Sequence, residues 1–327
     1  MISVADVVDA AIEVPVVPSF TRVGFDVRSR LDHWTPLDRY DLTGRVVLVT
    51  GATSGLGLAA SETLARLGAT LVLVGRNADK TERVRASLAE CTGNEHLHAV
   101  VADLGDLDAV RSAAATVTAE HDRLDVLVHN AGALTAQRTT APDGTEATVA
   151  SQVLGPFLLT GLLLDRLRSS APARVLTMSS GGMYAANLTA DALEMGDDYR
   201  GAEQYARAKR AQVTLTELWA ERLAGSGVVF HSVHPGWADT PGVAESLPRF
   251  RRVLGPLLRT PAQGADTLVW LAADDAVPLT TNGRFWLDRR PRSIHRLPTT
   301  RHSDTPERRA QLWAWCVDRT GLDPLAA

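Results

Sequence analysis

The sequence predicts an α/β fold, a doubly wound seven-stranded parallel sheet with helices on both faces. Short apolar, β-branched runs alternate with longer helical patterns along the chain of 327 residues, and this alternation is typical of such sheets. Several runs are hydrophobic without interruption, as expected of parallel strands that helices cover on both faces. Ligands of such sheets bind beyond the carboxyl ends of the strands, where the strand order reverses.

Each apolar run predicts one strand, and the segments between the runs predict helices. Helical patterns cover Leu58–Leu67, Asp106–Glu120 and Gln204–Leu223. The seven strands are expected at Val46–Thr50, Thr70–Val74, Leu97–Val101, Val126–His129, Val175–Met178, Val228–Val233 and Arg284–Leu287.

The strands fit one domain, residues 44–287, since large α/β folds often form a single unit. An N-terminal extension, residues 1–43, precedes this domain. Its Val- and Ile-rich start could form an amphipathic helix that docks on the body or touches a membrane. A mobile substrate lid is expected near residues 240–260. A C-terminal tail of residues 288–327 follows, with a last helix around Arg308–Arg319.

Composition indicates a soluble globular protein. The chain is 45% hydrophobic and 22% charged, and its formal net charge of −4 gives no reason to expect nucleic acid or an anionic membrane as a partner. Two cysteines are too few for a disulfide framework, so a reducing, cytoplasmic location is expected. The most apolar run, Leu154–Leu164, is far shorter than the ~20 residues that a spanning helix needs.

Tyr205 and Lys209 form the most informative motif of the chain. Four residues make about one helical turn, so the two side chains leave the same helix face. A phenol has a pKa near ~10, and a cation one turn away stabilises the phenolate and lowers that pKa. The chain holds two lysines, Lys80 and Lys209, beside 32 arginines, which indicates a need for a compact ammonium here. The pair could exchange a proton with a substrate oxygen; for the isolated motif, a solvated helix pair is the alternative.

A glycine-rich turn, Thr50–Gly57, follows the first strand directly and opens a helix. Its glycines, spaced Gly-x-x-x-Gly-x-Gly, permit a tight turn and close approach of the backbone to a pyrophosphate. The helix start adds free N–H groups and the positive end of the helix dipole. This placement favours cofactor binding over a purely structural turn.

Together these motifs resemble the short-chain dehydrogenase/reductase (SDR) family, in that family's order, over roughly residues 44–287. The resemblance implies a Rossmann-type fold. The matching pieces are Thr50–Gly57, Asp103-Leu104, His129–Gly132, Ser179-Ser180, Tyr205 with Lys209, Pro235-Gly236 and Thr240. A narrower likeness, to the subgroup called dehydrogenase/reductase SDR family member 12, rests on Met178–Met183, His234–Val243, Gln263–Thr267 and Gly283–Arg289.

The resemblance implies an oxidoreductase that interconverts a carbonyl, either aldehyde or ketone, and an alcohol on an apolar small molecule. Tyr205 would donate a proton to the carbonyl or accept one from the alcohol. Lys209 would lower the pKa of Tyr205 and bind the nicotinamide ribose, and Ser180 would hydrogen-bond the substrate oxygen. The gap from Ser180 to Tyr205 is longer than in many members, and the extra segment Met183–Asp198 is expected to wall the substrate site.

Cofactor preference can be argued from Arg76, in the sequence Gly75-Arg76-Asn77 after the second strand. NAD-specific proteins place an acidic residue there for the ribose 2′-hydroxyl, whereas an arginine can pair with the 2′-phosphate of NADP. NADP(H) is therefore favoured over NAD(H). The cofactor-binding residues that the resemblance implies are Gly51, Thr53, Ser54, Gly55, Leu56, Gly57, Arg76, Asn77, Asp103, Leu104, Asn130, Ala131, Gly132, Tyr205, Lys209, Pro235, Gly236 and Thr240.

Gln152 is the main departure from the family's pattern, and it joins Ser180, Tyr205 and Lys209 as a catalytic candidate. The family usually has Asn there, and that Asn anchors a water in the proton relay of the catalytic lysine. Gln has the same donor and acceptor groups on a side chain one methylene longer, so it could hold a shifted water or impair the relay. A nucleotide-binding regulator or scaffold with little turnover therefore stays as the alternative function.

No metal site is predicted. His96 and His98 lie two residues apart, but no Cys or carboxylate cluster completes a site. The expected partner is a small-molecule carbonyl or alcohol. The resemblance also implies a homodimer that pairs through the helices of Leu154–Leu164 and Gln204–Leu223, a surface that the terminal extensions could block.

Overall fold

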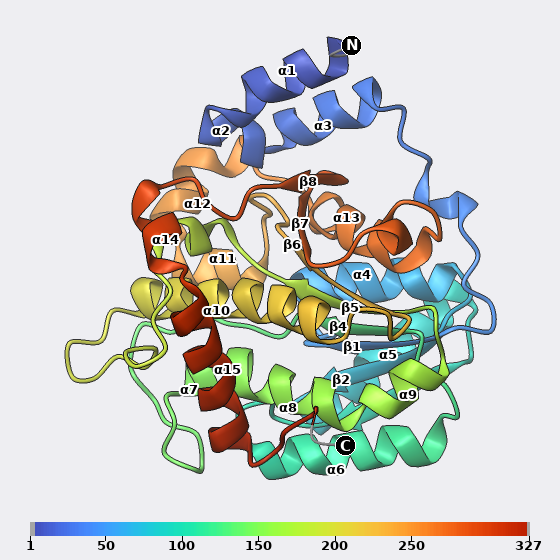
Figure 1. Ribbon diagram of the computed structural model, residues 1–327. Helices are drawn as coiled ribbons and strands as arrows, with labels where there is room; N and C mark the ends of the chain where they lie inside the picture. The colour runs from blue at the N-terminus through green and yellow to red at the C-terminus, as the bar shows by residue number, and fades with distance from the viewer. Residues whose placement is uncertain (1–3, 326–327) are drawn as a thin grey trace.

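The sheet runs through the middle of the molecule and has the predicted doubly wound order (Figure 1). A computed structural model describes residues 4–325 of the chain. Within these residues the strands lie side by side in the order β3-β2-β1-β4-β5-β6-β7-β8. Their bounds are Val46–Thr50 for β1, Thr70–Gly75 for β2, Leu97–Val101 for β3, Val126–His129 for β4, Ala173–Met178 for β5, Val228–Val233 for β6, Arg284–Leu287 for β7 and Arg290–Arg292 for β8.

All seven predicted strands are confirmed, and the neighbours among them pair in parallel. The sheet gains an eighth strand, β8, which pairs antiparallel with β7. Asp288 and Arg289 adopt φ values of 55° and 54°, and this left-handed pair turns the chain back on itself. A three-residue strand with Pro291 at its centre has no hydrophobic alternation, so the sequence offers no signal for it.

Two large apolar clusters, one on each face of the sheet, form most of the core. In β1, Val46 and Leu48 join the cluster on one face, whereas Val47 and Val49 join the cluster on the other. Successive residues of a strand point to opposite faces, which explains why β1 is hydrophobic throughout. One face carries α4 (Gly55–Arg66), α5 (Ala78–Thr92) and α13 (Pro261–Ala273), and the other carries α6 (Leu107–Glu120), α8 (Gly155–Leu162), α9 (Leu164–Ser169) and α10 (Gly201–Arg222).

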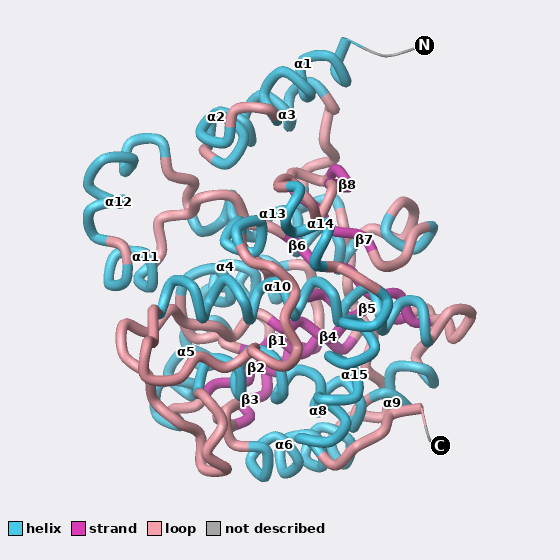
Figure 2. Tube along the Cα trace, turned by 60° about the vertical axis from the view of Figure 1, so that its left-hand side comes forward, coloured by secondary structure: helices cyan, strands magenta, loops and turns pink. Residues whose placement is uncertain are grey.

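Three helices form the N-terminal extension, and they lie at the end of the molecule next to β8 (Figures 1 and 2). Arg28 is 1% exposed and forms ion pairs with Asp9, Glu13 and Asp288. Arg259 binds the same Asp288 from the other side. Docking on the body, one of the two options that the sequence left open, is therefore realised. The three helices are α1 (Val4–Glu13), α2 (Val16–Phe20) and α3 (Arg22–Leu31).

The segment expected to be the lid contains two short helices, α11 (Pro241–Ser246) and α12 (Pro248–Leu254). Both begin with a proline, whose fixed φ suits the first helical position. Figure 2 shows α11 and α12 projecting from the body on the side of the extension.

The tail ends in α15 (Pro306–Thr320), which follows α14 (Pro298–Ser303). Trp313 of α15 packs against Phe157 of α8 and Trp219 of α10, with ring centroids 5.1 and 4.8 Å away. The helix α15 therefore covers the two helices through which a homodimer would pair. Among residues 4–325, no helix combines the length and the apolar character needed to cross a membrane.

Candidate active site

Ser180, Tyr205 and Lys209 meet at the carboxyl end of β5. Ser180 caps the 3₁₀ turn Gly181–Ala185 that follows β5, while Tyr205 and Lys209 lie in the first turns of α10. A Cβ built on Gly182 would lie 3.7 Å from Ser180 Oγ and 3.8 Å from Tyr205 Cδ1, so the hydroxyl and the phenol ring flank one point. Lys209 Nζ lies 5.3 Å from the centroid of the Tyr205 ring.

Burial sets the proton affinities of this centre. Burial raises the pKa of the Tyr205 phenol, and the neighbouring Ser180 hydroxyl lowers this pKa again in part. The lowering by Lys209 that the sequence suggested is therefore wrong for this structure, because burial outweighs it. Burial lowers the pKa of Lys209 to about 7, because an apolar surrounding disfavours the charged form. The ammonium donates to two acceptors, the Met178 carbonyl at 3.0 Å and Gln212 Oε1 at 2.9 Å. Lys209 can therefore change its protonation state near neutral pH, as a member of a proton relay must.

Gln152 lies in a π-helical turn, Ala150–Leu154, that leads into α8, and such turns are frequent at functional sites. Its Nε2 donates to the Ala133 carbonyl at 2.8 Å. Its Oε1 is buried and has no hydrogen-bond partner among the described residues. A Cβ built on Gly132 would lie 2.9 Å from this Oε1 and 3.3 Å from Lys209 Nζ, which places the amide close to the lysine.

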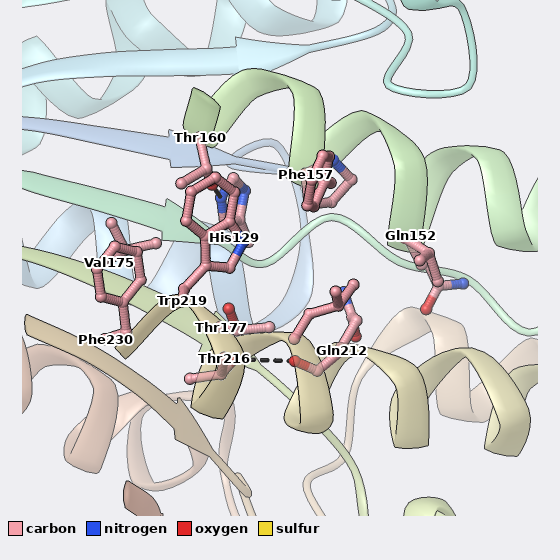
Figure 3. Close-up of a pocket in the computed structure, with 13 residues that line it drawn as sticks. His129, Gln152, Phe157, Thr160, Val175, Thr177, Gln212, Thr216, Trp219 and Phe230 are labelled. Carbon is pink, nitrogen blue, oxygen red and sulfur yellow. Dashed lines mark hydrogen bonds between the residues drawn. The ribbon is translucent and has the colours of Figure 1, made fainter. Parts of the chain in front are cut away.

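A small cavity of about 30 Å³, lined mainly by apolar side chains, lies between α8 and α10 (Figure 3). Gln152 and Gln212 both line it, from opposite helices. Within residues 4–325, His129 Nδ1 and Gln212 Nε2 are buried there without partners, like Gln152 Oε1. The volume suffices for one water molecule, and these three polar atoms could hydrogen-bond it. Gln212 is not among the predicted residues, although its place three residues after Lys209 puts both on one helix face.

The glycine-rich turn after β1 forms a cradle that side chains would fill. Gly51 has a φ of +64°, and a Cβ there would lie 2.7 Å from Ala131 Cα. A Cβ on Gly57 would lie 2.3 Å from Asn130 Nδ2. Asn130 Nδ2 donates to the Thr50 carbonyl at 3.0 Å and so ties the turn to the end of β4. The cradle and the free N–H groups at the start of α4 fit a dinucleotide pyrophosphate. The same turn contains Thr53, Ser54, Gly55 and Leu56.

Arg76 follows β2 directly, is exposed, and makes no ion pair with any described residue. Asn77 caps the first turn of α5 through its side-chain oxygen. Asp103 Oδ1 accepts a hydrogen bond from Gly105 N at 2.9 Å, and the adjacent Leu104 is buried. Asn77 and Asp103 thus have local partners, whereas the Arg76 guanidinium is free to meet a ligand.

Pro235, Gly236 and Thr240 lie on the loop after β6, which faces the glycine-rich turn. A Cβ built on Gly55 would lie 3.4 Å from Thr240 Cβ. Gly236 has a φ of +71° and packs on the guanidinium of Arg259. A Cβ built on Gly236 would lie 2.3 Å from Arg259 Cζ. The predicted cofactor residues therefore gather along the carboxyl ends of β1 to β6, including Ala131 and Gly132 after β4.

Phe20, from α2, is a neighbour of the site that no sequence signal indicated. Its ring centroid lies 4.3 Å from that of His234 and 5.6 Å from that of Trp237. Phe20 Cε2 lies 3.0 Å from where a Cβ on Gly181 would stand, and Gly181 directly follows Ser180. The extension thus adds an apolar surface beside the catalytic candidates.

One group of possible metal ligands exists in residues 4–325, on the side of the molecule where β3 forms the sheet edge. His98, Glu120 and His121 place ligand atoms within 4.8 Å of one another. The two imidazole rings pack edge to face with centroids 4.7 Å apart, and this packing accounts for the pair without an ion. One helix separates His98 from His121 in the sequence. The contact between these two histidines was therefore not predicted when His96 and His98 were considered as possible metal ligands.

Comparison with known proteins agrees with this geometry. A family model described as short chain dehydrogenase matches residues 45–249. The chain belongs to the short-chain dehydrogenase family. Dehydrogenase/reductase SDR family member 12 from Homo sapiens is 37% identical over 295 residues, which are 90% of this chain and 91% of that protein. Retinol dehydrogenase 11 from Homo sapiens is 33% identical over 263 residues, 79% of this chain and 82% of that protein.

Solved structures of the short-chain dehydrogenase fold resemble the chain as well. One, from Beutenbergia cavernae, is assigned as an NAD(P)-dependent gluconate 5-dehydrogenase and contains NADP at low occupancy. It is 27% identical, with a TM-score of 0.64, and the match covers 78% of this chain and 97% of that one. The expected family and the likeness to SDR family member 12 are thus confirmed, and the protein is an oxidoreductase of a family that binds NAD or NADP.

Proposed function

We propose that this short-chain dehydrogenase is an NADP(H)-dependent oxidoreductase that interconverts a carbonyl and an alcohol on an apolar small molecule. The observation that carries the proposal is the meeting of the Ser180 hydroxyl and the Tyr205 phenol beside the Lys209 ammonium. A hydroxyl, a phenol and a cation at one point can orient a substrate oxygen and move a proton to or from it.

Each residue then has a distinct task. Tyr205 exchanges the proton with the substrate oxygen, and Ser180 hydrogen-bonds that oxygen and stabilises the charge that develops on it. The Lys209 ammonium donates to Gln212 Oε1 and can pass its proton to a water in the small cavity that Gln212 and Gln152 line. The glycine-rich cradle would hold a nicotinamide cofactor, which would supply or accept the hydride when bound.

The preference for NADP(H) rests on Arg76 and on the residue before it. A Cβ on Gly75 would lie 2.3 Å from Thr81 Oγ1 and 2.9 Å from Thr53 Cγ2, so no acidic side chain fits there. The exposed guanidinium of Arg76 is suited to a 2′-phosphate.

The preference for an apolar substrate rests on the aromatic side chains around Ser180. Phe20 contacts Trp237, and Trp237 in turn packs edge-on against Phe250 of α12 with centroids 5.1 Å apart. We assign the walls of the substrate site to this cluster, to the insertion of residues 183–198 and to the lid. The free thiols Cys91 and Cys316 support the expected cytoplasmic location. A homodimer through α8 and α10 is not part of the proposal, because α15 occupies that surface.

The test is NADPH consumption with a panel of aldehydes and ketones, and alcohol oxidation with NADP⁺, for wild type and Tyr205→Phe. We expect the substitution to lower kcat by roughly 10²- to 10⁴-fold, because the proton donor is lost. Tyr40→Phe is the matched control, since Tyr40 bonds Asp274 instead and stands outside the site. Equal turnover in wild type and Tyr205→Phe would refute the role of Tyr205.

A nucleotide-binding regulator is the second candidate, and the observation that favours it is Gln152. Its buried Oε1 has no partner in the described part of the chain, and this side chain replaces the family's usual Asn. Tight NADPH binding without turnover on the whole panel, in wild type and in Gln152→Asn alike, would favour this reading. Turnover in wild type eliminates it.

A further inference from the structure

The helix α1 is amphipathic, but it is docked with its polar face inward. Asp9 is 6% exposed, and with Glu13 it faces the arginines that bind the extension to the body. The opposite face is apolar and exposed. It consists of Val7, Ala10, Ala11 and Val14, at the spacing of i, i+3, i+4 and i+7 that forms one helical stripe.

The apolar stripe continues into the next turn of chain. Val14 is 83% exposed, and Val16 and Val17 of the sequence Val14-Pro-Val-Val17 are 41% and 44% exposed. Val23 of α3 is 44% exposed. Hydrophobic side chains gathered in this way on a surface mark an interaction site, whereas single exposed ones are ordinary.

The lid adds similar side chains and positive charge at the same end of the molecule. Figure 1 draws α12 just below α2, and Phe20 of α2 and Phe250 of α12 both pack on Trp237. Leu247 is 40% exposed and Val253 of α12 is 76% exposed. Arg249 and Arg252 of α12 are exposed, and neither makes an ion pair with any residue in 4–325.

We propose that this face, made of the α1 stripe, residues 14–17, Val23 and α12, binds the surface of an anionic lipid bilayer. Exposed aliphatic side chains, together with the exposed arginines of α12, suit a surface that lies in the plane of a membrane interface. The negative net charge of the whole chain does not oppose this, because Arg249 and Arg252 act locally within a Debye length. A second copy of the chain fits less well, since two-fold pairing would bring like-charged arginines together.

The face adjoins the proposed substrate site. Phe250, on the same short helix as Arg249 and Val253, packs on Trp237, which contacts Phe20. A molecule that passes from the bilayer into the protein at this face would thus arrive near the catalytic candidates. The proposal concerns binding, however, and holds whether or not the protein turns over a carbonyl.

The experiment is co-sedimentation of the full chain with vesicles of phosphatidylcholine alone and of phosphatidylcholine with roughly 30% phosphatidylglycerol. We expect binding to the anionic vesicles that weakens with salt. Val14→Asp with Val17→Asp should lower the bound fraction at least roughly tenfold, because two charges then face the hydrocarbon. Val277→Asp, at a valine 49% exposed outside the face, is the control.

Arg249→Gln with Arg252→Gln should remove the preference for anionic vesicles while leaving the fold unchanged, as judged by the unfolding midpoint. Vesicle binding that is absent, or that is equal in wild type and the double-aspartate variant, would overturn the proposal. Sedimentation velocity distinguishes membrane binding from self-association. If the chain forms a dimer that Val14→Asp dissociates, and does not bind vesicles, the face binds a second copy of the chain instead.

Discussion

The catalytic centre and the docked N-terminal extension are assembled in opposite ways. Tyr205 and Lys209 lie one turn apart on a single helix, and Ser180 follows the strand at the centre of the sheet. The extension is instead held by Arg28, which reaches Asp288 at a separation of 260 positions in the chain. Chemistry is thus encoded in short motifs, whereas attachment is encoded in charges that only the complete fold brings together.

The two regions also treat a buried cation differently. Lys209 has no carboxylate partner among the described residues, and burial alone lowers its pKa to about 7. Burial acts against the charge of Arg28 too, but Asp288 and Asp9 outweigh it and raise the pKa of Arg28. A cation without a counter-ion can titrate and serve in a relay, while a paired one stays charged and serves as an anchor.

Acid is expected to have the largest effect, since it acts on both regions. Burial lowers the pKa of His129 and His234 to about 3 and that of His231 to about 4. Unfolded histidines take up a proton below about pH 6.5, whereas these folded ones stay neutral, so stability falls as the pH drops from 6.5 towards 4. Between pH 6.5 and 5 each should cost on the order of 2 kcal/mol.

Urea unfolding at pH 7 and pH 5 measures this loss. His234→Gln should reduce the pH dependence of the unfolding free energy by the contribution of one buried histidine. An unfolding free energy that is the same at both pH values would contradict the prediction.

Arg28→Met should have the second largest effect. It should lower stability by weakening the attachment of the extension while leaving cofactor binding unchanged. It leaves Asp9 and Asp288 buried with fewer counter-charges, which typically costs about 3–5 kcal/mol of unfolding free energy. Arg30→Met, at an exposed arginine two residues on, is the matched control and should change stability by less than about 0.5 kcal/mol. We expect the KM for NADPH to stay within about twofold of wild type, because the side-chain partners of Arg28 are Asp9, Glu13, Ser19 and Asp288, none of which belongs to the glycine-rich turn. A much larger change would show that the regions are coupled.

Arg76→Ala should have a smaller effect, confined to cofactor choice. Loss of a charge-assisted hydrogen bond to a 2′-phosphate costs about 1.5–3 kcal/mol, so the KM for NADPH should rise at least roughly tenfold. The KM for NADH should not change, since its 2′-hydroxyl carries no charge. Arg83→Ala, at an exposed arginine farther along α5, serves as the control. A parallel rise for both cofactors would remove Arg76 as the basis of the preference.

Gln212→Leu should have the smallest effect, a shift in the pH profile of kcat. The substitution removes one of the two acceptors of Lys209 Nζ, so the pKa of Lys209 should fall further and the loss of activity at high pH should begin earlier. Gln212→Glu should move the same limb to higher pH. If both variants lower kcat without moving the profile, Gln212 has a packing role only.

The strands and the catalytic motif were predictable because both depend on local patterns. Uninterrupted hydrophobic runs such as Val46–Thr50 have few alternatives to a buried parallel strand. Tyr205 and Lys209 are related by helix geometry alone. The strand β8 escaped prediction because its residues, Arg290–Arg292, resemble a polar loop until the turn at Asp288 aligns them with β7.

By itself the sequence determined the positions of seven strands along the chain, the glycine-rich turn and the Tyr205–Lys209 pair, since each follows from patterns of residues close in the chain. Only the tertiary structure decided that Phe20 lies beside Ser180, that Gln212 binds Lys209, and that α1 turns its acids inward. Amphipathic periodicity defines the two faces of a helix but not which of them is buried. In α1 the acidic face is the buried one because the arginines near β8 need carboxylate partners. Leaving those buried charges unpaired would cost more free energy than leaving the valines of α1 exposed.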